Sequence, residues 1–494
     1  MDRRTFVQTA SAAAMAATVP VSKALAAPTG VTSKMIGLQV GAVSFVDEGV
    51  EKCLDIFQSD AAINTLFVAT FTYGRGIAGR QIPGQPLPDH GKQTYDTDTF
   101  HGGCYTAINP KFFEDTVFKD FRAPDFGNNY DVLESVLPAA KKRGMKTICW
   151  FEDVFRKDLQ NIDTLEEVEL SGDRAVTLCF NNPNYRAWLL GMAENWASSY
   201  DIDGIMWGSE RQGAFSNMLG ASHGRAEGGH VTCFCQYCVA KAKDRGINPD
   251  RARQGFLELQ KFVTAGHKGQ RPVDGYYVTL WRLMLRYPEL LAWEMLWTDS
   301  LRETYAAIYE KVKSVKPSVQ VGWHIWHNNS FNPIYRAEQD LQAIAPHSDF
   351  LKIVMYHNCG GERMAAYIDN MASAAYGDLP KQELLDFHYR VLDYAERGLD
   401  EIPYTGFSSD YVYRETRRAR AGLEGTKTLL WPGIDVDIPT AENHSKCTPY
   451  GTRDAVAAAF RGGADGVLIS RKYSEMKLGN LKAVGDAIQQ IKLS

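Results

Sequence analysis

Residues 131–151, with the sequence DVLESVLPAAKKRGMKTICWF, contain a complete junction between a helix and a strand. Asp131 occupies an N-cap position before apolar residues at helical spacing, and Gly144 follows a basic last turn as a typical helix stop. Residues 147–151 then form a short apolar run. A helix that ends at a glycine and leads directly into a buried strand is typical of folds with a parallel sheet.

The same junction recurs along the chain. Residues 453–461 predict a helix, Gly462 and Gly463 end it, and a strand is predicted at once thereafter. The apolar runs of this kind are 36–45, 66–73, 147–151, 204–207, 319–326, 351–356, 428–434 and 466–470. Eight buried parallel strands alternating with helices predict an α/β protein of the (β/α)8 or TIM barrel class. An open doubly wound sheet is the alternative, but no run is followed by a GxGxxG loop.

Two predicted connections are much longer than a crossover helix requires. They are residues 74–130 after the second strand and residues 210–287 after the fourth. Both leave the C-terminal ends of strands, where such barrels carry their active sites. No repeat or low-complexity linker marks a further domain. We therefore expect residues 27–494 to form one barrel domain with long insertions after strands 2 and 4.

The N-terminal segment 1–26 is similar to a twin-arginine signal peptide. Arg3 and Arg4 precede an alanine-rich stretch over residues 7–21, and residues 24–26 read Ala-Leu-Ala, a small-residue cleavage pattern. An ordinary amphipathic helix is the alternative. The segment predicts recognition by the twin-arginine (Tat) export machinery, export in the folded state, and a periplasmic or secreted mature protein.

The composition is that of an ordinary globular protein. The 494 residues are 45% hydrophobic and 23% charged, with a formal net charge of −5. No basic excess indicates binding to nucleic acid or to an anionic membrane surface. No run reaches the ~18 consecutive apolar residues that a membrane span requires. We therefore expect neither a nucleic-acid partner nor a membrane span, and the oligomeric state is left open.

Polar residues follow most of the predicted strands, and a barrel brings the C-terminal ends of all its strands to one rim. Aromatic faces stack on sugar rings, and carboxylates and imidazoles bond to hydroxyl groups, so this mixture favours a carbohydrate ligand. The alternative for any one residue is a solvated or salt-bridged place on the rim. The predicted substrate-binding residues are Glu152, Asp153, Trp207, Arg211, His324, His327, Tyr356, His357, Asp437, Arg471 and Tyr473.

Cleavage of a glycosidic bond requires one carboxylic acid and a second carboxylate. Glu210 follows the fourth predicted strand and is the expected acid/base, while Asp435 ends the seventh and is the expected nucleophile, with Asp437 as the alternative. Strands four and seven face each other across a barrel mouth, so we expect the carboxyl groups of Glu210 and Asp435 to lie about 5–5.5 Å apart, the spacing of a retaining enzyme. We also expect a raised pKa for Glu210, and an ionised Asp435 beside Tyr356 or Arg471.

The second long insertion contains Cys233, Cys235 and Cys238 in a CxCxxC pattern. Thiolates at this spacing can hold a structural zinc ion on one tight turn. Cys104, on the other long insertion, is the expected fourth ligand, with His101 and His230 as alternatives. A disulfide with one buried thiol is the competing interpretation.

Glu210 followed on the same loop by the CxCxxC cluster resembles the clan of barrel glycoside hydrolases that includes the family 42 β-galactosidases. The resemblance implies an acid/base glutamate and a zinc site completed by a cysteine from an earlier loop. This chain has Ser209 and Asp435 where those enzymes carry asparagine and glutamate. Residues 101–105 and 201–207 are also similar to exported glycoside-hydrolase-like barrels of bacteria.

These observations favour a retaining glycoside hydrolase that acts on an external oligosaccharide or glycoside. Two alternatives remain open. One is a non-catalytic barrel that binds glycans without cleaving them. The other is a metal-dependent sugar isomerase or epimerase, whose cation ligands would be Glu152, Glu210, His324, His327 and His357.

Overall fold

The computed structural model describes residues 34–73, 80–97, 102–127, 129–153, 158–224 and 230–493. The predicted signal peptide, residues 1–26, lies outside the described residues. So does His101, one of the alternative zinc ligands.

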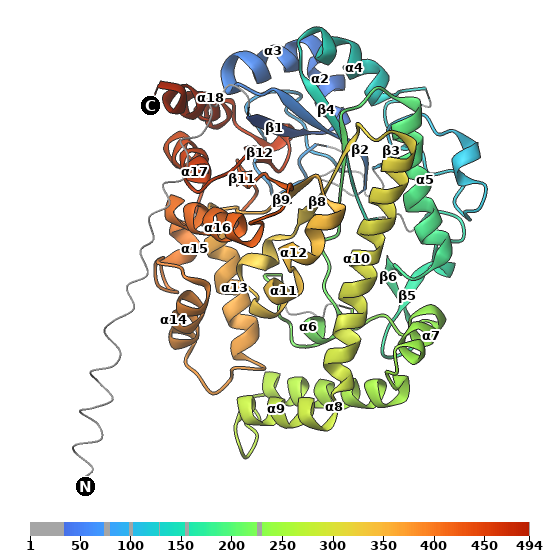
Figure 1. Ribbon diagram of the computed structural model, residues 1–494. Coiled ribbons are helices and arrows are strands. Elements are labelled where there is room, and N and C mark those ends of the chain that lie inside the picture. The colour runs from blue at the N-terminus through green and yellow to red at the C-terminus, as the bar shows by residue number, and fades with distance from the viewer. Residues whose placement is uncertain are drawn as a thin grey trace. The chain divides into compact units, whose positions relative to one another are not determined.

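Nine strands form a curled sheet in the centre of the described chain (Figure 1). They are β1 (Met35–Val40), β2 (Thr65–Tyr73), β4 (Lys146–Glu152), β7 (Gly204–Gly208), β8 (Gln320–Ile325), β9 (Phe350–Ile353), β10 (Leu429–Leu430), β11 (Gly433–Asp435) and β12 (Gly466–Ser470). Their order is β10-β9-β8-β7-β4-β2-β1-β12-β11, and the pairs along it are parallel. A tenth strand, β3 (Gly102–Cys104), is antiparallel to β2. The predicted α/β class with a parallel sheet is confirmed.

Residues 429–435 contact both ends of this strand order. β10 pairs with β9, and β11 pairs with β12. Between them, the backbone N–H of Trp431 donates to the carbonyl of Leu351 at 2.9 Å, and the carbonyl of Pro432 accepts from the N–H of Leu468 at 2.9 Å. Pro432 has no N–H to donate, which separates the segment into two short strands.

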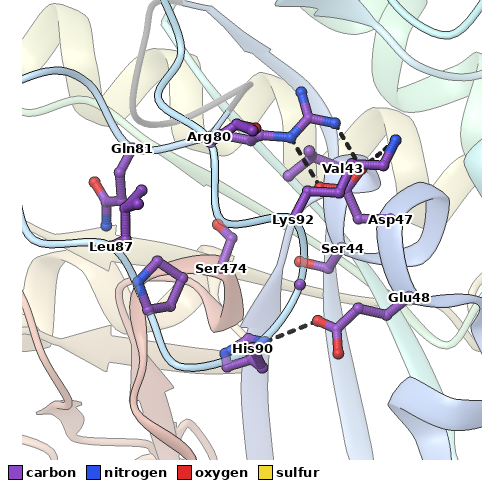
Figure 2. A pocket seen from close by; sticks show the side chains of 13 residues that line it. Val43, Ser44, Asp47, Glu48, Arg80, Gln81, Leu87, His90, Lys92 and Ser474 are labelled. Atoms are coloured by element: carbon purple, nitrogen blue, oxygen red, sulfur yellow. Dashed lines mark hydrogen bonds and ion pairs between the residues drawn. The ribbon is translucent and has the colours of Figure 1, made fainter.

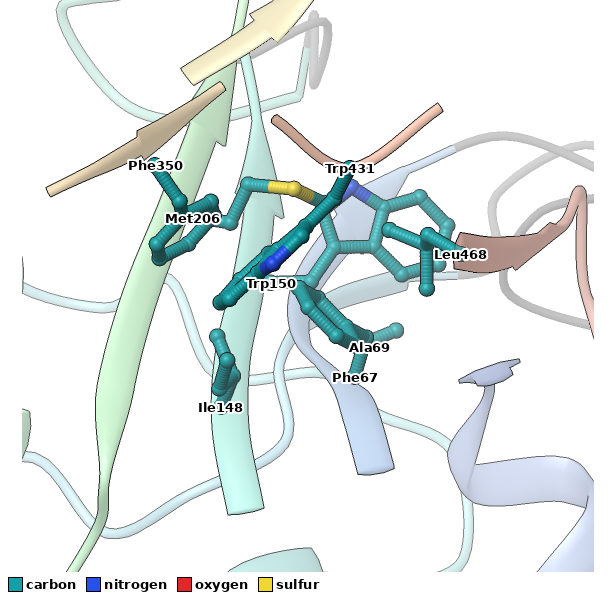
Figure 3. Close-up of a cluster of buried hydrophobic side chains, with 8 residues drawn as sticks. All are labelled: Phe67, Ala69, Ile148, Trp150, Met206, Phe350, Trp431 and Leu468. Atoms are coloured by element: carbon teal, nitrogen blue, oxygen red, sulfur yellow. The ribbon is translucent and has the colours of Figure 1, made fainter. Parts of the chain in front are cut away.

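A cluster of large apolar side chains fills the concave side of the sheet (Figure 3). Its members are Phe67, Ala69, Ile148, Trp150, Met206, Phe350, Trp431 and Leu468. Side chains alternate between the two faces of a strand, so residues two positions further along face the same side at the C-terminal edge. These residues are Glu152, Gly208, Lys352 and Ser470. A polar layer therefore follows the apolar one at this edge.

Helices surround the sheet (Figure 1). They include α2 (Ala42–Glu48), α3 (Val50–Ala61), α4 (Val132–Lys142), α5 (Pro183–Ser199), α10 (Glu289–Val315), α11 (Pro333–Glu338), α12 (Leu341–Ile344), α13 (Gly360–Ala372), α14 (Lys381–Leu392), α15 (Ile402–Thr405), α16 (Ser409–Gly422), α17 (Pro449–Arg461) and α18 (Leu478–Leu493). The predicted start of α4 is confirmed, because the Asp131 side chain accepts from the N–H groups of Leu133 and Glu134. α17 begins earlier than the expected residue 453.

Both expected insertions carry structure of their own. The first contains β3 and the 3-10 helix η2 (Pro110–Phe113), and the second contains α6 (Ala214–Met218), α7 (Gln236–Asp244), α8 (Pro249–His267) and α9 (Tyr276–Arg286). A third insertion, which the sequence did not indicate, follows β4 and contains the hairpin of β5 (Glu166–Val168) and β6 (Arg174–Leu178). Within the described residues, no helix is long and apolar enough to cross a membrane.

Candidate active site and cysteine cluster

A lateral row of residues crosses four neighbouring strands at the C-terminal edge of the sheet. Glu152 of β4 is in register with Gly208 of β7, Gly208 with His324 of β8, and His324 with Lys352 of β9. A Cβ atom at Gly208 would lie 2.6 Å from the Cβ of His324. The glycine therefore leaves the space in which the imidazole lies.

Glu210 lies just beyond this row. Its Oε1 accepts a hydrogen bond from Nε2 of His324 at 2.9 Å, and its side chain is 56% exposed. Desolvation acts to raise the pKa of Glu210, but the hydrogen bond from His324 and the positive charge of Arg363 outweigh it and lower the pKa to about 2. Glu210 is therefore an ionised carboxylate that solvent reaches. The expected raised pKa at Glu210 is wrong.

Glu152 has the opposite electrostatic environment. Burial and the negative charge of nearby Glu210 raise its pKa to about 7, while the charges of Arg471 and Lys352 act against this shift. Glu152 is therefore partly protonated near neutral pH. The two carboxyl groups differ in pKa in the way that a proton donor and an ionised partner require.

Lys352 connects the polar layer across the sheet. Its Nζ donates to Oε1 of Gln39 at 2.9 Å and to the hydroxyl of Tyr356 at 3.0 Å, and the Ser470 hydroxyl donates to the same Gln39 oxygen at 2.7 Å. Burial lowers the pKa of Lys352 to about 7. Sequence patterning could have identified this lysine, because it continues the inward-facing positions of β9 beyond Phe350.

His327 lies in the loop after β8, and Arg363 lies on α13; the two side chains border the polar layer. Arg363 donates to Nδ1 of His327 at 3.0 Å, so Nε2 carries the proton and donates to the Tyr411 hydroxyl at 3.1 Å. Burial lowers the pKa of His327 well below its usual range. The imidazole is therefore neutral and orients Arg363, whose charge acts on Glu210.

His223 is a further member that the sequence did not reveal. Its ring centroid lies 5.1 Å from that of Trp326 and 6.0 Å from that of His327. Burial lowers its pKa to about 3, with Arg363 acting in the same direction and Glu210 against it. Neither His223 nor Arg363 follows a strand directly, which is why an inventory of strand ends misses both.

Five of the predicted substrate-binding residues lie around Glu210. They are Glu152, His324, His327, Tyr356 and Arg471, which either contact Glu210 or one another or carry a charge that acts on it. Arg471 is also held by Glu475, to which its Nε donates at 3.1 Å.

Asp435, the expected nucleophile, is buried at the end of β11. It is 0% exposed, its Oδ2 accepts from the N–H of Cys359 at 2.9 Å, and its Oδ1 accepts from the N–H of Ile438 at 3.3 Å and from the Cys447 thiol at 3.3 Å. The alternative, Asp437, accepts from the N–H of Lys477 and from the amide of Asn480. Both aspartates thus connect neighbouring loops, and the expected pairing of Glu210 with Asp435 stays a prediction.

Four other predicted residues connect the sheet with its helices and loops. Trp207 packs on the helix side of the sheet, 5.7 Å from Tyr305, because it alternates with the inward-facing Met206. Asp153 accepts from Nε of Arg211 at 2.9 Å in a buried ion pair. Tyr473 stacks on His90 at 4.1 Å. His357 faces a different cavity, described below.

A polar pocket lies where residues 80–94 cross α2 (Figure 2). Arg80 makes a two-pronged contact with Asp47, with distances of 2.9 and 2.6 Å, and His90 contacts Glu48 at 2.8 Å. These side chains pair with one another, and their contacts connect the first insertion to α2.

Four buried cysteines form a separate cluster: Cys179, Cys233, Cys235 and Cys238. Their sulfur atoms all lie within 4.8 Å of one another, and the distances from Cys179 to Cys235 and to Cys238 are both 3.5 Å. Four thiolates bound to zinc at about 2.3 Å lie roughly 3.8 Å apart, so this set fits a closed tetrahedral zinc site. The amide of Asn181 donates to the sulfur of Cys238 at 3.2 Å.

Cys179 replaces the expected fourth ligand. Cys104 lies in β3, where its thiol contacts the Thr106 hydroxyl at 3.2 Å, and His230 pairs with Glu169 at 2.6 Å. Cys179 follows β6, in the insertion that the sequence did not indicate, so no spacing pattern linked it to the CxCxxC loop.

No family model matches the sequence. No curated protein matches it either. Among solved structures, a β-galactosidase from Halorubrum lacusprofundi is 14% identical with a TM-score of 0.50 and covers 92% of this chain and 57% of its own. Gan42B, a GH42 β-galactosidase, is 12% identical with a TM-score of 0.50 and covers 93% of this chain and 57% of its own. In its fold the chain therefore resembles these two β-galactosidases, and it spans little more than half of their length.

Proposed function

We propose that the protein is a glycoside hydrolase built on a closed (β/α)8 barrel. Residues 429–435 support closure, because they pair with β9 on one side and with β12 on the other. Counted as a single strand, this segment brings the parallel strands to the eight of the barrel class. The carboxyl groups then meet at the C-terminal mouth, where barrel enzymes place their chemistry.

The observation that carries the proposal is the pair of Glu152 and Glu210. They come from neighbouring strands, the charge of one acts on the other, and their pKa values lie on opposite sides of the ordinary range. Glycosidic cleavage requires one protonated and one ionised carboxyl group. This pair replaces the pair expected from the sequence.

In the proposed reaction, Glu152 donates its proton to the leaving glycosidic oxygen. Glu210, kept ionised by His324 and Arg363, either attacks the anomeric carbon or takes a proton from an attacking water. Lys352 and Tyr356 provide hydrogen-bonding groups beneath the sugar. Direct attack retains the anomeric configuration and the water route inverts it.

The four-cysteine cluster is proposed to hold a structural zinc ion. Four protein ligands close the coordination sphere, so the ion would stabilise loops rather than act on substrate. The cluster joins the insertion after β4 to the loop that begins with Glu210. It would therefore help to position the active-site loop.

The carbohydrate is proposed to be extracytoplasmic, because residues 1–26 have the features of a twin-arginine signal. An isomerase or epimerase is less well supported. Among the described residues, the four cysteines form the one group of three or more candidate metal ligands close enough to share an ion. The five ligands expected for a catalytic cation do not form such a group.

A panel of 4-nitrophenyl glycosides and neutral polysaccharides tests the proposal. We expect release of sugar from at least one substrate, abolished in Glu210→Gln. Proton NMR of the first product then assigns retention or inversion. Binding of glycans without any product in the whole panel would favour the non-catalytic alternative and contradict the proposal.

A further inference from the structure

A second cavity lies outside the candidate active site. Its volume is about 450 Å³, and it is formed by the loop after β9, the end of α15 and the start of α17. Among the residues that line it are His357, Asn358, Tyr404, Ser445, Tyr450 and Gly451. None of them was assigned a role in the proposed reaction.

Two exposed aromatic residues flank this cavity. Tyr404 is 58% exposed and Tyr450 is 67% exposed. Tyr404 meets the edge of His444 with ring centroids 5.3 Å apart, and the guanidinium of Arg453 lies 5.0 Å from the centre of the Tyr450 ring. These contacts leave much of each ring accessible at the cavity. Amphipathic tyrosine rings are suited to stack on the apolar faces of sugars.

Polar groups line the interior of the cavity. His357 is 6% exposed, and its Nδ1 has no hydrogen-bond partner in the part of the chain that the structure describes. Burial lowers the pKa of His357, so the ring is neutral and offers one donor and one acceptor. A Cβ atom at Gly451 would lie 3.7 Å from its Nε2, in ordinary van der Waals contact, so a larger branched side chain at this position would cover the ring.

Hydrogen bonds between lining residues hold the walls of the cavity together. The hydroxyl of Ser445 donates to Oδ1 of Asn358 at 2.7 Å, and the amide of Asn358 donates back to the carbonyl of Ser445 at 3.3 Å. The lining contains one basic residue, Lys446, and one acidic residue, Asp454. Lys446 is engaged by the oxygens of Thr440 and Ala441. This balance suits an uncharged ligand with many hydroxyl groups.

Two consecutive residues connect the cavity to the active site. The Tyr356 hydroxyl accepts from Lys352 in the polar layer, whereas His357 faces the second cavity. Both sites thus lie at the C-terminal edge of the sheet. A ligand held in the second cavity would lie close to the mouth that contains Glu210.

We propose that this cavity is an accessory binding site for neutral oligosaccharides, with Tyr404 and Tyr450 as stacking platforms and His357 as the hydrogen-bonding group. The ligand class rests on the proposed function, while the site rests on its own geometry. It would hold a long glycan beside the active-site mouth.

Binding is tested on the Glu210→Gln protein, which cannot consume the ligand. Isothermal titration with a series of neutral hexasaccharides (gluco-, galacto-, manno- and xylo-configured) identifies the probe. Adding Tyr404→Ala and Tyr450→Ala together should weaken its binding at least about tenfold, since stacked rings and their hydrogen bonds are lost. Gly451→Val, which fills the space beside His357, should weaken binding in the same direction.

Tyr277→Ala, which removes a 48% exposed tyrosine on α9, is the matched control and should leave the affinity unchanged. Equal affinity in the Tyr404/Tyr450 variant, or no hexasaccharide binding at millimolar concentration, overturns the proposal. Tyrosine-dependent binding by a protein that hydrolyses no glycoside would uphold this site and refute the proposed function. Hydrolysis with tyrosine-independent binding would do the reverse.

Discussion

Glu210 and Asp435 both stand at the C-terminal ends of parallel strands, yet the structure uses them differently. Glu210 is 56% exposed and accepts one hydrogen bond from a side chain, that of His324. Asp435 is 0% exposed and accepts from the backbone N–H groups of Cys359 and Ile438. The carboxylate of Glu210 is therefore accessible to a ligand, whereas backbone N–H groups already occupy the carboxylate of Asp435.

The chain beyond each strand explains this difference. After β11, Asp437 adopts a left-handed conformation with φ of 56°, and the turn brings the N–H of Ile438 onto Asp435. After β7, Arg211 is instead anchored by the buried carboxylate of Asp153. Glu210 lies between β7 and Arg211, and among the described residues its carboxylate accepts no hydrogen bond from a backbone N–H group.

The largest expected effect follows from Glu210→Gln. We expect kcat/KM to fall by at least about 10³-fold, because the amide can neither attack nor accept a proton. Stability should fall by roughly 1–2 kcal/mol at pH 7, because the amide loses the charge interactions that lower the pKa of this partly exposed carboxylate. Steady-state kinetics on the substrate found in the glycoside panel and urea unfolding measure the two quantities.

Asp435→Asn is the matched control for that comparison. It should lower the free energy of unfolding by about 1–3 kcal/mol, because its new NH2 group can face the N–H donors of Cys359 or Ile438. Below the unfolding temperature it should retain most of the activity. A loss of activity as large as that of Glu210→Gln, in a folded protein, would restore Asp435 as the nucleophile.

The pH dependence of kcat/KM tests the proposed role of Glu152 as the proton donor. Its pKa of about 7 means that the proton donor is lost as pH rises through 7, while Glu210, with a pKa of about 2, stays ionised throughout. We therefore expect kcat/KM to be level between pH 4 and 6 and to fall above about 7. Glu152→Gln should reduce kcat/KM by about 10²-fold or more and remove this alkaline decline. Substrates with activated leaving groups should recover part of the loss, and an unchanged pH profile would contradict the assignment.

We expect the proposed zinc site at the cysteine cluster to stabilise the loop that carries Glu210 without taking part in the proposed reaction. Cys179→Ser should lose bound zinc, as measured by elemental analysis, and lower Tm by several degrees. Cys104→Ser should keep its zinc, because that thiol contacts Thr106 instead. Zinc retained in Cys179→Ser and lost in Cys104→Ser would refute the proposed ligand set.

The sequence was sufficient for the parallel sheet because each strand leaves a local signal. Residues 131–151 carry a cap, a helical pattern, a glycine stop and an apolar run, and all four appear in the structure. Glu210, His324 and the CxCxxC loop were identified for the same reason, since each lies at or shortly after such a signal.

The parts of the site that the sequence did not reveal depend on long-range contacts. Cys179 and Cys233 meet because the hairpin after β4 packs on the loop after β7, and Arg363 reaches His327 from α13. No local pattern encodes these encounters. Glu152 was recognised as a strand-end acid, but its protonation depends on how near Glu210 lies. The turn that supplies a backbone N–H to Asp435 was likewise not visible in the sequence.

The smallest effect concerns Glu338, a buried acid without backbone N–H donors among the described residues. It lies against Glu294, whose carboxylate accepts from the N–H groups of Phe215 and Ser216 at the start of α6. Burial and the charge of Glu294 raise the pKa of Glu338 to about 10, from an ordinary value of 4.5.

A raised folded-state pKa means that its contribution to stability is complete below pH 4.5 and declines as pH rises towards 10. Glu338→Gln, which is neutral at every pH, should therefore gain about 1.4 kcal/mol of stability relative to wild type at pH 5.5 and almost nothing at pH 4. Urea unfolding at the two pH values measures the difference. A gain of the same size at both would show that proton loss from Glu338 is not its cause.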